Sequence, residues 1–167
     1  MEDFAAMRLI AKQAIKKEFR QSWQFRFEIP QAPDDFDFYV KDVSYGPIEV
    51  ETEPEKIGPS ALTITYPIAS APVQLSMTMR DHEDGRIHNW FAGLVSKVLL
   101  EDGTIALPPE YCLNVERYTV LQTGSGTGGV LTDTWVMYPT QLGDVTESRD
   151  EPGFCEFPIT FIQFRSL

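Results

Sequence analysis

The spacing of hydrophobic residues changes its period early in the chain. Residues 3–22 repeat apolar side chains at steps of three and four, which predicts an amphipathic helix. Residues 23–29 then alternate apolar with polar side chains, as does the run 36–40, and such alternation is typical of half-buried strands. Two prolines and two aspartates in residues 30–35 predict a turn between them. We therefore expect these two strands to pair as an antiparallel hairpin.

The rest of the chain predicts one packed helix among several strands. Residues 87–98 carry a wide apolar stripe at steps of three and four, formed by Ile87, Trp90, Phe91, Leu94, Val95 and Val98. Further strands are expected at 61–66, 73–80, 112–122, 130–138 and 154–165. Strands grouped around one helix, without an internal repeat, predict an α+β fold. We expect an antiparallel β-barrel or sandwich with one packed helix, formed by residues 23–167, and an N-terminal amphipathic helix in residues 1–22.

Composition narrows the class of protein. The chain has 167 residues, the usual size of one domain, and two cysteines, too few for a disulfide framework. It shows no secretory signal and no apolar run near the roughly 18 residues of a membrane span, so we expect no membrane anchor. The net charge of −11 argues against a nucleic-acid-binding surface.

The charge is unevenly distributed, and two rows of charged residues stand out. Residues 1–30 hold six basic and four acidic residues, whereas residues 31–167 hold eight and twenty-one. At four-residue steps one helix side carries Arg8, Lys12, Lys16 and Arg20. In an extended segment with Pro54 at a sheet edge, one side carries Glu49, Glu51, Glu53 and Glu55. Each row is either a solvated face or an assembly interface; the acidic row would face a lumen or a basic partner.

Motifs that suggest chemistry do not have the context that the chemistry needs. Gly124, Gly126 and Gly129 match a dinucleotide-binding spacing, but a strand follows them rather than a helix, so we interpret them as a hairpin loop. His82 and His88 lack a metal-ligand spacing and fit an acidic helix cap with two surface histidines. Neither the cysteines nor the scattered carboxylates form a recognisable catalytic set. The sequence predicts no enzyme, no cofactor and no metal site.

Three stretches, in order, carry a resemblance to a known family. They are residues 23–29 with 36–44, residues 73–79 with 87–91, and residues 138–140 with 142–144 before the last strand. Together they resemble the tail tube protein family of contractile-tailed bacteriophages over residues 23–167. The N-terminal helix is longer and more basic than expected for the main tube subunit. The segment 53–72 is short for the hairpin by which many tube proteins grip a neighbour.

The resemblance implies a structural virion protein of the viral tail. Such a subunit forms hexameric rings that stack into the tail tube, or into the baseplate tube, and DNA is ejected through the lumen without specific binding. Its partners are its own copies and other tail proteins such as sheath, baseplate or terminator, and it is assembled in the host cytoplasm. The two departures favour a specialised ring such as the baseplate initiator. The alternative from the residues alone is a monomeric acidic binding or regulatory module without catalytic activity.

Overall fold

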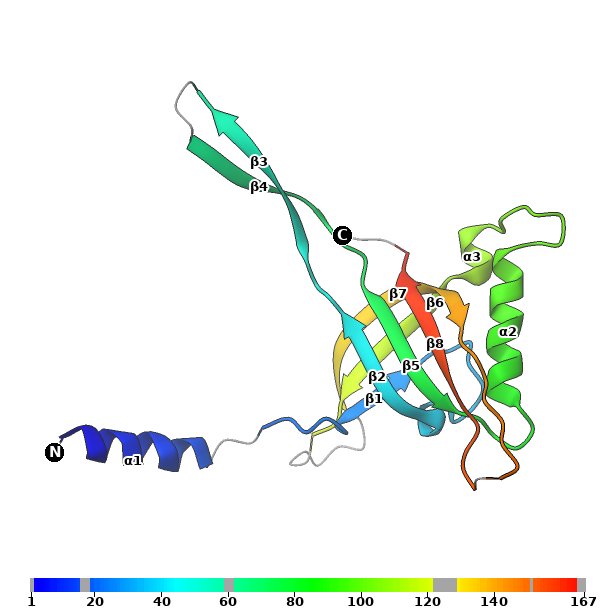
Figure 1. Ribbon diagram of the computed structural model, residues 1–167, viewed down its shortest axis with the longest axis horizontal. Coiled ribbons are helices and arrows are strands. Elements are labelled where there is room, and N and C mark those ends of the chain that lie inside the picture. Colours follow the sequence, from blue (N-terminus) through cyan, green and yellow to red (C-terminus); the bar gives the residue numbers. More distant parts are fainter. Residues whose placement is uncertain (1, 16–18, 59–61, 122–128, 151, 165–167) are drawn as a thin grey trace.

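The protein is a curled antiparallel sheet with one packed helix and two projections (Figure 1). The computed structural model describes residues 2–15, 19–58, 62–121, 129–150 and 152–164. Its helical elements are α1 (Glu2–Ile15), the 3₁₀ turn η1 (Phe36–Tyr39), α2 (Arg86–Val98) and α3 (Pro108–Tyr111). Its strands are β1 (Phe25–Glu28), β2 (Val40–Gly46), β3 (Val50–Ile57), β4 (Leu62–Ser70), β5 (Gln74–Arg80), β6 (Leu113–Thr119), β7 (Val130–Leu142) and β8 (Glu156–Gln163).

The main sheet has six strands in the order β1-β6-β7-β8-β5-β2, and every neighbouring pair is antiparallel. This confirms the predicted α+β class. The terminal strands β1 and β2 do not pair with each other, so the described strands form an open, sandwich-like sheet rather than a closed barrel. β3 and β4 form a separate two-stranded sheet.

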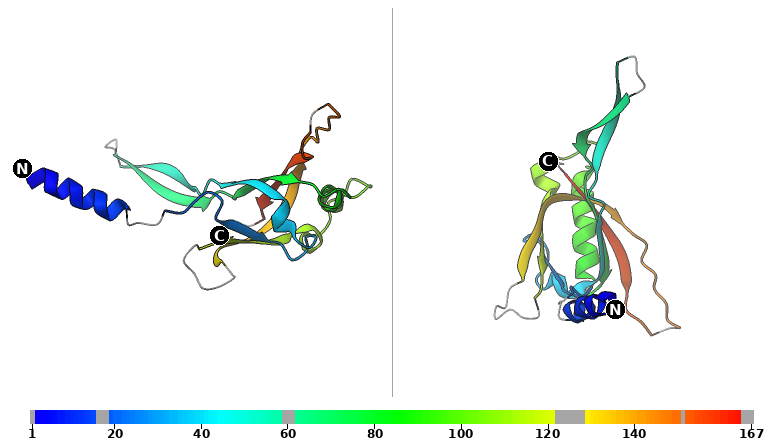
Figure 2. Two further views of the ribbon diagram at one scale, coloured as in Figure 1. Left: turned by 90° about the horizontal axis from the view of Figure 1, so that it is seen from below. Right: turned by 90° about the vertical axis from the view of Figure 1, so that its left-hand side faces the viewer.

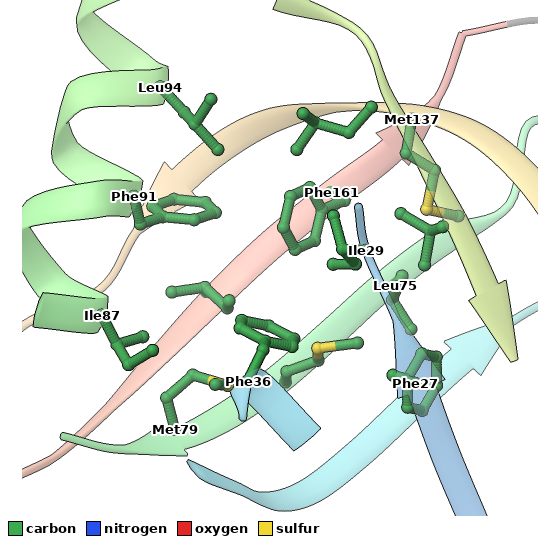
Figure 3. Packing of buried hydrophobic residues seen from close by; sticks show 14 of the residues in the cluster. Phe27, Ile29, Phe36, Leu75, Met79, Ile87, Phe91, Leu94, Met137 and Phe161 are labelled. Atoms are coloured by element: carbon green, nitrogen blue, oxygen red, sulfur yellow. The ribbon is translucent and has the colours of Figure 1, made fainter. Parts of the chain in front are cut away.

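The hydrophobic core lies between the concave side of the sheet and α2 (Figure 3). Strands β5 to β8 alternate buried and more exposed residues, so each contributes one row of apolar side chains. Helix α2 adds Ile87, Phe91 and Leu94, and the Phe91 ring meets Phe161 edge-to-face at 5.3 Å between centroids. The prediction of a helix packed on a sheet is confirmed. Trp90 is only partly buried, at the rim of this core.

The predicted hairpin of residues 23–29 and 36–40 is wrong. Strand β1 pairs with β6, β2 pairs with β5, and most of the run 36–40 forms η1. In this turn Phe36 is buried whereas Phe38 is 84% exposed, although alternation had placed the two on one face. The Asp37 carboxylate accepts the backbone N–H of Phe27 at 2.8 Å. The segment therefore joins β1 through a side chain instead of a strand ladder.

The predicted N-terminal helix is also shorter than the apolar pattern suggested. Among the described residues α1 ends at Ile15, and the chain at residues 19–21 has no regular structure. A turn follows, in which the Gln24 side chain accepts the N–H of Gln21 at 2.6 Å and donates to the carbonyl of Val120 at 2.9 Å. Gln24 thus fastens the incoming chain to the end of β6, and β1 begins only at Phe25.

Candidate assembly surface

The β3–β4 hairpin projects from the body into solvent (Figures 1 and 2). Every side chain of β3 is exposed, and so are those of residues 63–69 in β4. The hairpin runs from Val50 to Ser70 and includes most of the segment 53–72. Pro54 lies inside β3 without breaking it, because each strand of a two-stranded sheet has a free edge.

The two faces of the hairpin differ in chemistry. Residues directly opposite each other in an antiparallel pair share a face. The register therefore assembles one face, called here the acidic face, from Glu51, Glu53, Glu55, Ile57, Ile64, Tyr66 and Ala69. The Tyr66 hydroxyl lies 3.4 Å from the Glu53 carboxylate, to which it donates, in agreement with that register. The other face presents Val50, Thr52, Pro54, Lys56, Thr63, Thr65, Pro67 and Ser70.

Three of the four predicted glutamates thus lie in one row on one face. Glu49 precedes β3, where its carbonyl accepts the N–H of Ala71 at 3.1 Å and closes the base of the hairpin. Ile64 and Tyr66 lie in the same face as the carboxylates and are 45% and 39% exposed. The acidic face is therefore a mixed surface of charge and exposed apolar area, which the sequence pattern did not indicate.

Helix α1 is the second projection (Figures 1 and 2). Its large apolar side chains are exposed, with Phe4 at 75% and Ile15 at 84%, so none of them joins the core. At about 100° per residue, Phe4, Met7 and Ile15 fall on one arc of the helix, and Arg8 and Lys12 border that arc. The helix presents an apolar surface flanked by positive charge.

The predicted basic row is only partly placed on α1. Arg8 and Lys12 lie one turn apart on the helix. Lys16 lies outside the described residues. Arg20 lies beyond the end of α1, and its guanidinium lies 3.4 Å from the hydroxyl of Tyr45 in β2, to which it donates. The structure thus separates Arg20 from the helical stripe and places it against the body.

The outer strands of the main sheet carry a small charge network. Lys41 of β2 donates to Glu156 at 2.8 Å, and Arg80 of β5 donates to the same carboxylate at 2.9 Å. These hydrogen bonds, first from Lys41 and then from Arg80, hold the pKa of the exposed Glu156 below its usual range. The network links β2, β5 and β8 at the solvent side. It orders the margin of the sheet beside the free edge of β2.

The residues that suggested chemistry have structural positions. The Asp81 carboxylate accepts the N–H groups of Ile87 and His88 at 3.1 and 3.4 Å, which confirms the acidic cap of α2. Burial raises the pKa of both cysteine thiols, Cys112 and Cys155, which favours the unreactive protonated form.

In the part of the chain that the structure describes, no group of three or more His, Cys, Asp or Glu is arranged to hold a metal ion. None of the described helices has the length and apolar character to cross a membrane.

The fold is similar to solved structures, although the sequence matches no protein-family model and no curated protein. One is a chain of the extracellular contractile injection system PVC sheath-tube complex in the extended state, with a TM-score of 0.63 and 14% identity. The similarity covers 93% of this chain and 95% of that one. This chain therefore shares the fold of that protein. The part of this chain that the similarity leaves uncovered is shorter than α1 and the β3–β4 hairpin taken together. The similarity therefore includes part of these projections.

Two further solved structures are similar over nearly their whole length. The PVC sheath/tube terminator in the extended state gives a TM-score of 0.63 at 13% identity, covering 91% of this chain and 97% of that one. The anti-feeding prophage cap, a tube terminating cap, gives 0.64 at 10% identity, covering 90% and 91%. At these identities the likeness establishes the fold. It does not show that the chain belongs to the bacteriophage tail tube family.

Proposed function

We propose that this protein is a structural ring subunit of the tube in a contractile tail or injection system. The observation that carries the proposal is the β3–β4 hairpin, in which the described side chains from Val50 to Ala69 are exposed and none joins the core. An isolated two-stranded hairpin is marginally stable in water, so this element needs contacts outside its own subunit. The similar solved structures are a sheath-tube complex, a sheath/tube terminator and a tube terminating cap.

The sheet edges fit the same role. Strands β1 and β2 end the six-stranded sheet, and no described strand pairs with their outer edges. Free edges recruit strands from other molecules unless they are covered. A closed ring of identical subunits covers such edges through heterologous contacts. We propose a hexameric ring that stacks on neighbouring rings and contacts sheath, baseplate or terminator proteins, as a component of a tail or virion-like particle.

An acidic subunit suits the wall of a conduit. A net charge of −11 per copy repels phosphate, so a nucleic acid passing through the lumen would slide without sticking. In a bacteriophage tail, which the resemblance of residues 23–167 implies, that nucleic acid is the ejected DNA. Because two of the similar structures are a terminator and a tube cap, a terminal ring is as well supported as a main-tube or initiator ring.

The test is the oligomeric state of the purified protein. Size-exclusion chromatography with light scattering should give hexamers or larger assemblies, and negative-stain electron microscopy should show rings with a central hole. Long hollow filaments would indicate a main tube subunit, and isolated rings an initiator or terminal ring. A protein that remains monomeric at every concentration tested contradicts the proposal and supports the alternative, an acidic binding or regulatory module.

A matched variant asks whether the hairpin makes the contacts. Replacing residues 50–70 with a short Gly-Ser linker removes an element that contributes nothing to the core cluster. The variant should keep the melting temperature of the wild type and lose assembly. A shortened protein that still forms rings would show that the hairpin is dispensable and would remove the main support for the proposal.

A further inference from the structure

We propose that helix α1 of one copy docks on the acidic face of the β3–β4 hairpin of a second copy. This inference rests on the proposed function, since it names the contact that holds two subunits together. It joins two projections that have no extensive packing against other described elements: a helix that carries Arg8 and Lys12 beside exposed apolar side chains, and an acidic hairpin face with exposed apolar side chains.

Among the described elements, neither projection packs extensively on the body of its own subunit. A 14-residue helix is marginal in water unless its apolar side packs on something, and α1 has no extensive packing against another described element. The hairpin has the same deficit, because β3 and β4 pair only with each other. A single docking contact would bury the apolar arc of α1 around Phe4, Met7 and Ile15 against Ile64 and Tyr66 of the acidic face.

The charges match in sign and in spacing. Side chains four residues apart on a helix, such as Arg8 and Lys12, are separated by about 6.0 Å along its axis. Alternate residues of a strand, such as Glu51, Glu53 and Glu55, are separated by about 6.6 Å. A helix lying along β3 can therefore set consecutive basic side chains opposite consecutive carboxylates. The lengths also agree, at about 21 Å for α1 and about 26 Å for β3.

The geometry of the subunit favours a second copy over the helix's own hairpin. In Figure 1 and in the right-hand view of Figure 2, α1 and the hairpin leave the body at separate places and in different directions. Between them lies the start of the body, where Arg20 contacts Tyr45 and Gln24 fastens the chain to β6. An arm held in this way reaches outward from its own subunit. In a ring or a stack of rings the next copy presents the same acidic face.

A charge-reversal series tests the docking. The helix variant R8E/K12E and the hairpin variant E51K/E53K should each raise the protein concentration needed for half-maximal assembly about tenfold, because exposed pairs of this kind contribute modestly and add up in a repeated contact. The quadruple variant, which restores opposite charges across the contact, should return that concentration toward the wild-type value. The control E83K/E101K makes the same charge change as E51K/E53K, but at exposed residues of the body. It should leave the concentration for half-maximal assembly unchanged.

Cross-linking between separate copies tests whether α1 docks on the hairpin of a second copy or on that of its own chain. Two differently tagged proteins, one with K12C and one with E53C, and both with Cys112 and Cys155 changed to serine, should form a mixed dimer with a short bis-maleimide. Replacing E53C by E83C should abolish it. A link formed only within a single chain carrying both K12C and E53C overturns docking on a second copy. Wild-type assembly unaffected by the reversals overturns the docking alone, whereas a monomeric wild type overturns the proposed function as well.

Discussion

Removing α1 separates a role in assembly from a role in folding. A variant lacking residues 1–18 keeps Arg20, whose guanidinium donates to Tyr45, and loses the whole projecting helix. If α1 completed the core, losing the burial of Phe4 and Ile15 would cost about 1.5–3 kcal/mol each. At about 2–4 °C per kcal/mol for a chain of this size, the melting temperature would fall by about 6–24 °C.

The structure predicts a much smaller thermal effect. Phe4 is 75% exposed and Ile15 is 84% exposed, and α1 has no extensive packing against another described element. The free energy of unfolding should therefore change by less than about 1 kcal/mol and the melting temperature by less than about 4 °C. Assembly, in contrast, should require a higher protein concentration.

Two measurements on the same sample decide the matter. Circular dichroism or differential scanning fluorimetry gives the melting temperature below the assembly concentration, and light scattering gives the oligomeric state above it. A fall of more than about 6 °C in the dispersed subunit would refute the placement of α1 outside the core. A truncated protein with wild-type stability that also assembles like the wild type would refute any interface role for α1.

Three further predictions concern the body of the subunit. Phe91→Ala should lower stability by about 3–5 kcal/mol, measured by thermal and chemical unfolding, whereas the control Phe38→Ala should stay within about 0.5 kcal/mol of the wild type because Phe38 is exposed. Asp133→Ala should cost about 3–5 kcal/mol in the same assays, because it leaves the buried guanidinium of Arg117 unpaired; a tolerated change would contradict the buried ion pair. Burial raises the pKa of Asp37, so the folded state holds that proton more tightly and loses stability as the pH rises through the raised pKa. Asp37→Asn keeps a hydrogen-bond acceptor. Its melting temperature should therefore be higher than that of the wild type at neutral pH and equal to it at about pH 3. A lower melting temperature than the wild type at neutral pH would contradict this sign.

The local spacing of apolar residues predicted the elements that pack on the hydrophobic core. The helix at residues 86–98 repeats apolar side chains at steps of three and four, whereas the strands around 74–80 and 156–163 alternate buried and more exposed residues. One side of each element must be apolar because it packs on the core. Pro54 correctly indicated a strand at a free edge. In each case the signal and the cause lie within one element, so a single sequence was sufficient to find them.

The errors arose where a distant contact decides the conformation. Residues 36–40 alternate like a strand, but the hydrogen bond from the Phe27 backbone to Asp37 and the left-handed conformation of Asp35, with φ of 61°, turn them into η1. The short helix α3, which begins with two prolines, is not among the predicted elements. The mixed acidic and apolar face of the hairpin also escaped prediction, because it depends on which residues of β4 lie opposite β3.

The charge distribution sets two opposing electrostatic effects in the proposed assembly. Each copy carries −11, so copies repel one another as a whole, while the α1–hairpin contact attracts locally. Salt screens both, with a Debye length of about 8 Å at physiological ionic strength. If the local contact dominates, wild-type assembly weakens as salt rises. The R8E/K12E variant has lost that attraction, and its net charge is more negative by four, so its residual assembly should strengthen with salt. Opposite salt slopes of the two proteins in light scattering would assign the attraction to α1, whereas parallel slopes would show that α1 contributes nothing to the balance.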